Sequence, residues 1–334
     1  MKYDITAIGN ALVDTQFKVS HELIEELGLQ IDQMNLSNAE EQAPIINRLI
    51  KEKAESISDC GGSATNTLVA ASNFGAKCFH TCVVANDEDG HRYLNSLKTA
   101  GIKHLGKMHD PKNLPTGKCL ILVTPDAKRT MTTALNVSSA MSEMDLDLES
   151  ISDSKIFYIE GYMVTGDENY QSLIKVLDHL NDYPSVKKAL SLSDPGIVGA
   201  FIDRFKKIES YGLDFIFCNA DEANAFTNTN STQDSVGILL KKPYTTIITR
   251  GMHGCITISK GKHFESQGRQ IDAVDSNGAG DMFAGCFLYA FLQDCNLQSC
   301  ADFSNYGASK VVESFGPRLN KVGYEEVLKN IKKY

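Results

Sequence analysis

The segment at 275–281 reads DSNGAGD and combines small, flexible residues with a carboxylate at each end. It precedes MFAGCFLYAFLQ, an apolar run with helical spacing, so Asp281 lies in the first turn of a predicted helix. The first amides of a helix have no partner inside it, and together with the helix dipole they hold anions. Gly278, Ala279 and Gly280 therefore predict a phosphate cradle. Asp281 either handles a proton or a metal beside that phosphate, or it caps the helix.

Two segments nearer the N-terminus supply further polar groups. CGGSATN at 60–66 brings Gly62, Ser63 and Asn66 to the start of a predicted helix, where close backbone approach and a side-chain amide suit a ligand. A simple turn with a Ser cap is the alternative. GNALVD places Asn10 and Asp14 after the first predicted strand, where the carboxylate of Asp14 could accept hydrogen bonds from two vicinal hydroxyls, or could belong to a surface turn.

Three more candidates follow later in the chain. NADE offers Asn219 and Glu222, which could hold Mg²⁺ through water or could form a helix cap with an acidic first turn. TRGMHG at 249–254 is fully explained as a hairpin turn, and only its context makes Thr249, Gly251 and Gly254 nucleotide contacts. Arg129, in a predicted hairpin, could reach a phosphate or remain solvated.

Alternating strand and helix patterns predict the elements that position these groups. The strand-like runs are YDITAIG, KCFHTCVVA, SKIFYIEG, KKALSLSDP, LDFIFCNADE and YTTIITRG. Helical patterns separate these runs, and one of the patterns predicts a continuous helix over 197–208. This order predicts an α/β fold with a mostly parallel sheet covered on both faces. The segments at roughly 11–60 and 112–138 break the rhythm, and the hairpin signal PDAKR in the second predicts a small β-rich lid on one single domain, 1–334.

Composition excludes several classes of function. The net charge of −9 with no basic stripe argues against nucleic acid as a partner, and no apolar run is long enough for a membrane helix. The nine Cys and the N-terminus, which lacks a signal-peptide pattern, predict reduced thiols and a cytoplasmic location. CFHTC at 78–82 is better explained as a buried strand than as a zinc site. No Walker sequence is present, and no G-x-G-x-x-G opens a helix after the first strand.

Taken together, GGSATN, NADE, TRGMHG and DSNGAGD resemble, in order, the four signatures of the PfkB/ribokinase family of carbohydrate and nucleoside kinases. The resemblance covers nearly the whole chain and is closest to adenosine-kinase-like members, through GNALVD, the helical excursion that follows it, and SKVVESFGPRL. TMTTALNVS and Cys286 depart from the pattern of that group. The resemblance implies a three-layer ribokinase-like fold with a mostly parallel sheet and a small β-rich lid.

The resemblance also implies roles for the candidate residues. Asp281 would be the general base, beside an anion hole made by the amides of Gly278, Ala279 and Gly280. ATP and Mg²⁺ would be the cofactors, with a monovalent cation as an open question. The remaining assignments are the acceptor site (Asn10, Asp14, Gly62, Ser63, Asn66, Arg129), magnesium through water (Asn219, Glu222) and the nucleotide side (Asn219, Glu222, Thr249, Gly251, Gly254, Asn305).

The sequence leaves the acceptor and the assembly open. The leading hypothesis is transfer of phosphate to the 5′-hydroxyl of a nucleoside, adenosine above all. A kinase of a free sugar such as ribose or fructose fits the shared motifs equally well, and a nucleotide sensor without catalysis is a third alternative. The chain is expected to act as a monomer or homodimer on small molecules, without nucleic acid or membrane partners.

Overall fold

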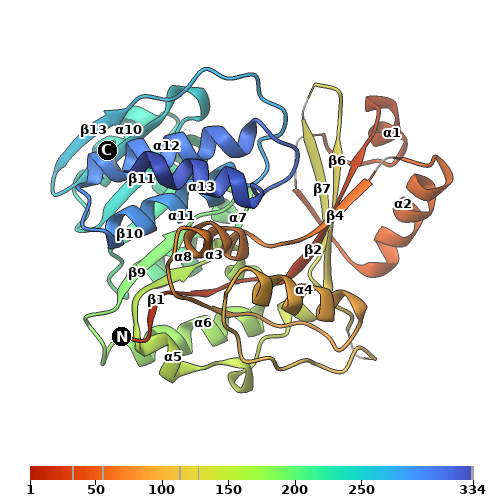
Figure 1. Cartoon of the computed structure of the whole chain (residues 1–334), viewed down its shortest axis with the longest axis horizontal. Coiled ribbons are helices and arrows are strands. Elements are labelled where there is room, and N and C mark those ends of the chain that lie inside the picture. The colour runs from red at the N-terminus through yellow and green to blue at the C-terminus, as the bar shows by residue number, and fades with distance from the viewer. Residues whose placement is uncertain (32–33, 55, 113, 127, 332–334) are drawn as a thin grey trace.

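The chain folds into an α/β body with a smaller β-rich lid at one side (Figure 1). The computed structural model describes residues 1–31, 34–54, 56–112, 114–126 and 128–331. The lid sheet takes its strands from Leu12–Gly61 and Gly117–Ala134. Within the predicted lid segments, residues 32–33, 55, 113 and 127 lie outside the described part of the chain.

An eight-stranded sheet forms the centre of the body. Its order is β13 (Lys262–Ser266), β12 (Cys255–Ser259), β11 (Thr245–Thr249), β10 (Phe215–Asn219), β9 (Lys187–Ser191), β8 (Ser154–Ile159), β1 (Tyr3–Ile8) and β5 (Cys78–Thr81). All neighbours from β11 to β5 pair in parallel, and the pairs β11–β12 and β12–β13 are antiparallel. The mostly parallel sheet and the hairpin at TRGMHG are therefore confirmed, and the carboxyl ends of the parallel strands share one edge.

Successive residues of the parallel strands face two separate apolar cores, because side chains alternate across a sheet. In β8, Ile156 and Tyr158 join one core, and Phe157 and Ile159 join the other. The first core is covered by α3 (Ser63–Asn73), α4 (Glu88–Thr99), α11 (Ala279–Leu292), α12 (Leu297–Val312) and α13 (Lys321–Asn330). The second is covered by α5 (Leu148–Ser152), α6 (Asp167–Leu180), α7 (Pro195–Ala200), α8 (Ile202–Glu209), α9 (Ala220–Thr227) and α10 (Thr232–Leu239).

The helix predicted over 197–208 is two helices, and the expectation of one continuous helix is wrong. Phe201 leaves helical geometry, with φ −121° and ψ 30°, and separates α7 from α8. Its side chain packs against the second core, and the Arg204 guanidinium lies 5.3 Å from its ring centroid. The apolar periodicity continues through the break because both short helices bury the same face.

The short 3₁₀ segments are η1 (Asn136–Ser139), η2 (Glu143–Asp145), η3 (Gly161–Val164) and η4 (Gly251–His253).

The lid is a five-stranded sheet in the order β3 (Met34–Ser37), β7 (Arg129–Ala134), β6 (Gly117–Val123), β2 (Leu12–Lys18) and β4 (Ser56–Gly61). The β6–β7 pair is the predicted antiparallel hairpin. Alternation along β6 sends Leu120 and Leu122 to an outer core with α1 (His21–Glu26) and α2 (Ala39–Lys51). Cys119 and Ile121 face the opposite way, and this inner face lines the cavity described below.

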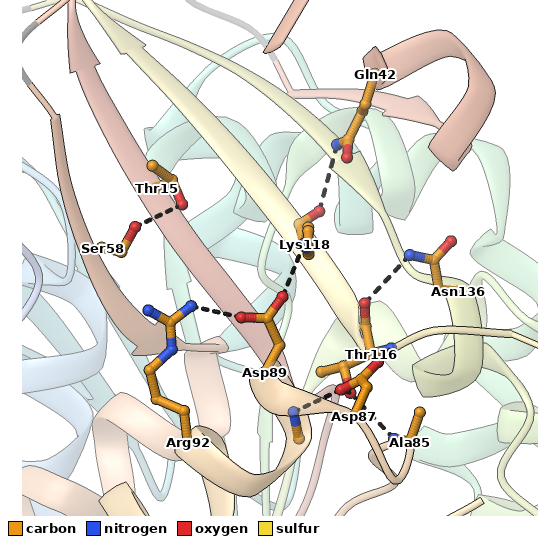
Figure 2. Close-up of polar contacts among 11 residues, drawn as sticks. Thr15, Gln42, Ser58, Ala85, Asp87, Asp89, Arg92, Thr116, Lys118 and Asn136 are labelled. Atoms are coloured by element: carbon orange, nitrogen blue, oxygen red, sulfur yellow. Dashed lines mark hydrogen bonds and ion pairs between the residues drawn. The ribbon is translucent and has the colours of Figure 1, made fainter. Parts of the chain in front are cut away.

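A polar joint fixes the base of the lid to the body (Figure 2). Asp87 caps α4 by accepting from the Gly90 amide at 2.8 Å, and it also accepts from the Thr116 amide at 2.8 Å and the Thr116 hydroxyl at 2.6 Å. Nearby, the Lys118 ammonium lies 2.7 Å from the Asp89 carboxylate. Partial burial raises the pKa of Asp87, but the bonds from Thr116 and Gly90 outweigh it and hold that pKa below its usual range. One ionised carboxylate therefore ties the first lid strand of the hairpin to a body helix.

Two further findings concern membrane-spanning helices and the cysteines. Among the described residues, no helix combines the length and the apolar character that crossing a membrane requires. All nine cysteines are free thiols. Cys78 and His80 lie in β5, where the His80 ring bonds to Thr65 and to the Ala7 carbonyl, as expected for a buried strand.

The joint at Asp87 can be tested with the substitution Asp87→Ala. Loss of a helix cap and of the bonds to Thr116 should lower the free energy of unfolding by about 2–4 kcal/mol, measured by urea denaturation. Asp147→Ala is a matched control, because Asp147 caps α5 through Ser150 alone and should cost about 1 kcal/mol. Equal losses in the two variants would show that Asp87 is only a cap.

Candidate active site

The buried carboxylate of Asp275 holds the loop 275–281 through hydrogen bonds with backbone amides. Asp275 has no exposed surface and accepts from the Asn277 amide at 2.9 Å and the Gly316 amide at 3.0 Å. Gly278 has a left-handed backbone with φ 74°, and a Cβ there would lie 2.3 Å from the Pro317 carbonyl oxygen. Any other residue at 278 would be both strained and obstructed. Asp275 therefore shapes the loop, and the catalytic candidate is Asp281.

The start of α11 provides free backbone donors. Gly278 is its N-cap, and no side chain caps the helix. Among the described residues, the amides of Gly278, Gly280 and Asp281 have no acceptor, whereas the Ala279 amide bonds to the Ser276 carbonyl at 3.3 Å. Free amides at a helix N-terminus are suited to an anion. Ala279 departs from the expected set in this conformation of the loop.

Asp281 makes its contacts outside its own helix. Its Oδ1 accepts from the Ser63 hydroxyl at 2.6 Å, and its Oδ2 accepts from the Asn66 side-chain amide at 2.9 Å. Burial raises the pKa of Asp281, while these two bonds and the charges of Arg318 and Arg129 act in the opposite direction. A carboxylate with a raised pKa that faces the donor loop is suited to accept a proton. The alternative of a simple helix cap is not what the structure contains.

A second group of polar residues lies beyond the carboxyl ends of β1 and β8, with Asp14 on the adjoining lid strand β2. Asp14 is 7% exposed, lines the cavity described below and accepts no hydrogen bond from any described residue, so neither of its oxygens has a protein donor. Burial raises the pKa of Asp14 to about 7, with Arg318 as the main opposing charge. The glycine pair ahead of α3 makes room for this group, since a Cβ at Gly61 would lie 1.9 Å from the Asp14 carboxylate and one at Gly62 would lie 2.3 Å from the Asn10 carbonyl oxygen.

Glu160 is a buried carboxylate that sequence reasoning missed. Its Oε1 accepts from the Asn10 side-chain amide at 3.0 Å and its Oε2 from the Ala64 amide at 2.8 Å. Burial raises the pKa of Glu160 to about 7, although the bonds from Ala64 and Asn10 lower it. Asn10 also accepts from Asn169, so its side chain is fixed on both sides. The sequence signal for Glu160 is its position directly after a predicted parallel strand, where ligand-binding side chains gather.

Asn219 and Glu222 form the predicted helix cap as well as part of the cavity wall. Glu222 donates its amide to the Asn219 oxygen at 2.8 Å and accepts from the Asn219 amide at 3.0 Å and the side-chain nitrogen at 2.7 Å. Both Glu222 oxygens are therefore occupied, and burial raises the pKa of this carboxyl to about 7. No cluster of three or more His, Cys, Asp or Glu suited to a metal occurs in the described part of the chain. This donor set fits a hydrated Mg²⁺ contacted through water and does not fit direct coordination.

The cavity between body and lid brings most of the predicted residues together. Its volume is about 370 Å³, a size suited to a ligand of several rings. Asn10, Asp14, Gly62, Ser63, Asn66, Arg129, Asn219, Glu222, Thr249, Gly278, Gly280 and Asp281 all line it. Apolar side chains also line it, from the lid segments (Leu12, Met34, Leu36, Cys119, Ile121, Met131, Leu135) and from the body (Phe217, Cys218, Phe283).

Arg129 joins the lid to the anion loop. It donates to the Asn277 side-chain oxygen and to the Ser276 hydroxyl, both at 2.9 Å, and its Nε lies 3.6 Å from the Asp275 carboxylate. The side chain is 20% exposed, so the alternative of a merely solvated hairpin arginine does not apply.

Three residues predicted for the nucleotide lie outside this cavity. Gly254 has φ 83°, and a Cβ there would lie 2.0 Å from the Ser266 carbonyl oxygen. The fold itself therefore explains a glycine at this position. Asn305 donates to the Ser266 and Gln267 carbonyls, each at 3.3 Å. Gly251 lies in the exposed η4 turn. Nucleotide binding by these three residues stays a prediction.

Comparison with known proteins identifies the family of this chain. The model of the pfkB family of carbohydrate kinases matches residues 35–322. The chain belongs to this family. As a pfkB kinase it has the ribokinase-like α/β fold, and the kinase activity predicted from the four motifs is confirmed at the level of the family.

Individual pfkB relatives extend over the whole chain. The chain is 27% identical to adenosine kinase of Saccharomyces cerevisiae over 350 aligned positions, covering 98% of this chain and all of the relative. The solved adenosine kinase of Sinorhizobium meliloti has a TM-score of 0.89 at 25% identity, covering 98% of this chain and 99% of that one. A probable sugar kinase of Rhizobium etli has a TM-score of 0.90 at 23% identity and 99% coverage of both chains.

The buried carboxylate of Asp14 gives a test of the site's electrostatics. With its pKa raised to about 7, the folded protein holds this proton to a higher pH than the unfolded chain, where Asp titrates near about 4. The stabilising contribution is therefore full below about pH 4 and is lost as pH rises through about 7. Ligand-free protein should become less stable from about pH 5 to about pH 8, and Asp14→Asn should flatten this loss by up to about 3 kcal/mol.

Urea denaturation at several pH values measures this slope. Asp178→Asn is the control, because Asp178 is exposed on α6 and, among the described residues, its side chain bonds to the Tyr211 hydroxyl alone. The assignment of a raised pKa to Asp14 is contradicted by Asp14→Asn and wild type showing parallel pH slopes.

Proposed function

We propose that this pfkB kinase transfers the γ-phosphoryl group of ATP to the 5′-hydroxyl of adenosine. The observation that carries the proposal is that polar groups and apolar lid side chains line the same cavity. Asp281 of α11 and Asp14 of β2 are among the polar groups, called the floor below, and Leu36, Met131 and Ile121 are among the apolar side chains, called the wall. A free sugar is polar on all sides and gains little from such a wall, whereas a purine base buries apolar surface against it.

In this arrangement the ribose lies on the floor. The unpartnered Asp14 carboxylate would accept from the 2′- and 3′-hydroxyls, which restores the hydrogen bonds that its burial removed. Asn66 and Ser63 would hold the sugar near Asp281, which would remove the 5′-hydroxyl proton as the bond to phosphorus forms. These roles agree with the likeness to the S. cerevisiae and S. meliloti proteins named adenosine kinase.

The phosphoryl group would lie at the start of α11. Free amides of Gly278, Gly280 and Asp281 would stabilise the charge on the equatorial oxygens, and Arg129 could exchange its contacts with Ser276 and Asn277 for phosphate oxygens. Mg²⁺ bound with ATP would neutralise the phosphates, and Glu222 would orient its water shell. We also propose a cytosolic location and the action of the protein on small molecules alone, in line with its free thiols.

A panel of acceptors tests the substrate. Adenosine, other nucleosides, ribose and fructose are each incubated with ATP and Mg²⁺, ADP release is measured, and the product is identified by ³¹P NMR. We expect adenosine to give AMP with the highest kcat/KM. Turnover of ribose or fructose without any nucleoside would replace the proposal by a sugar kinase, the reading favoured by the likeness to the R. etli protein.

Asp281→Asn tests the catalytic base. Asparagine keeps the size of the side chain and cannot accept the proton, so kcat should fall by about 10³-fold or more, while adenosine affinity measured by calorimetry changes little. Asp178→Asn should keep wild-type kcat. Retention of turnover in Asp281→Asn would remove Asp281 from the role of base.

A further inference from the structure

Arg318 is a buried arginine beside the site that lies outside the four family signatures, within the segment SKVVESFGPRL. It lies between α12 and α13, and its side chain is 10% exposed. Its Nε donates to the Asn66 side-chain oxygen at 2.8 Å, and its Nη1 donates to the Ser96 hydroxyl at 3.3 Å. The same Nη1 lies 3.9 Å from the Asp59 carboxylate. The guanidinium therefore contacts α3, α4 and the lid strand β4.

The contact with Asn66 determines how that side chain meets Asp281. A guanidinium can only donate, so it must face the Asn66 oxygen and leaves the amide nitrogen on the other side. That nitrogen donates to Asp281 Oδ2 at 2.9 Å. A rotated amide would oppose donor to donor at Arg318 and acceptor to acceptor at Asp281. Arg318 therefore selects the orientation of Asn66 in which it holds the carboxylate.

The backbone that carries Arg318 is packed on the anion loop itself. The Gly316 amide donates to Asp275 at 3.0 Å, and the Pro317 carbonyl lies where a Cβ of residue 278 would be. Phe315, at the start of the same segment, packs against the inner face of the lid. The segment 315–318 thus contacts the lid, the anion loop and α3 with consecutive residues.

We propose that Arg318 is a positioning residue that fixes the carboxylate of Asp281 through Asn66 and balances the negative charge around it. The proposal rests on the function proposed above, in which Asp281 accepts the proton. Arg318 need not touch either substrate to act in this way, because it acts on Asp281 through Asn66 and through its own charge.

The charges that face Asp281 come from every surrounding element. The cations are Arg129 of β7 and Arg318, and the other titratable groups are Asp14 of β2, Tyr158 of β8, Glu160 and Tyr162 after β8, and Glu222 of α9. Burial raises the pKa of Asp281 and Arg318 lowers it. Removal of Arg318 should therefore raise this pKa further, and a larger fraction of the base would be protonated at a given acidic pH.

Substitutions at Arg318 separate positioning from a purely structural role. Arg318→Gln should lower kcat for adenosine by about 10²-fold, the scale of a small displacement of a catalytic group, with KM for ATP nearly unchanged. The acidic limb of its kcat profile should move to higher pH. Arg318→Lys keeps the charge and one donor, so it should recover about tenfold of the loss and keep the limb near the wild-type pH.

Arg48→Gln is the matched control, since Arg48 lies on α2 of the lid and its ion pairs within the described part of the chain are with Glu26 and Glu52. It should keep wild-type kcat and pH profile. Melting temperatures of all variants show whether any loss of activity follows a loss of folding. An unchanged kcat and pH limb in Arg318→Gln, or equal losses in Gln and Lys variants that follow stability, would overturn the proposal.

Failure of the proposed function gives a different result. If wild type turns over another acceptor in place of adenosine, the same comparison is made with that acceptor. A crystal structure of Arg318→Gln needs no acceptor, and it should show the Asn66 side chain moved away from Asp281. Finding Asn66 and Asp281 in their wild-type contact would overturn the positioning role whatever the substrate.

Discussion

Four carboxylates, Asp14, Glu160, Glu222 and Asp281, surround one cavity, and the rest of the site depends on how their mutual repulsion is offset. Each has a pKa raised by burial. Backbone amides, capping bonds and two arginines provide the opposing polarity, and the free amides at the start of α11 leave room for an anion. A magnesium–nucleotide complex and a polyhydroxyl acceptor would add the donors and the cation that the protein alone does not supply.

The lid completes this balance from the other side. Its outer face is occupied by α1 and α2, and its inner face contributes apolar side chains and Arg129 to the cavity. The joint at Asp87 and Thr116 anchors one lid strand to α4, and the contacts of Arg129 reach the anion loop. The lid is thus attached to the body by polar groups at its base and at its active-site end. Closure of such a lid would exclude the water that competes as phosphoryl acceptor.

Much of this could be predicted from the sequence, since strands, helices and motifs have local patterns. The polar ends of β1, β10 and β11 converge because parallel strands share a carboxyl edge, and the predicted residues Asn10, Asp14, Asn219 and Thr249 line one cavity. No role was predicted for Glu160 or Arg318, because each acts through partners far away in the chain and neither belongs to the four family signatures. The break at Phe201 was missed because two short helices share one buried face.

The central claim is that one cavity holds a nucleoside with its 5′-hydroxyl at Asp281. The most direct measurement is a crystal structure of the protein with adenosine and a non-hydrolysable ATP analogue. The account predicts the 5′-oxygen within about 3 Å of an Asp281 oxygen. It also predicts the ribose diol on Asp14 and the base against Leu36 and Met131. Adenosine bound with its 5′-oxygen turned away from Asp281, or with its base on the polar floor, would contradict it.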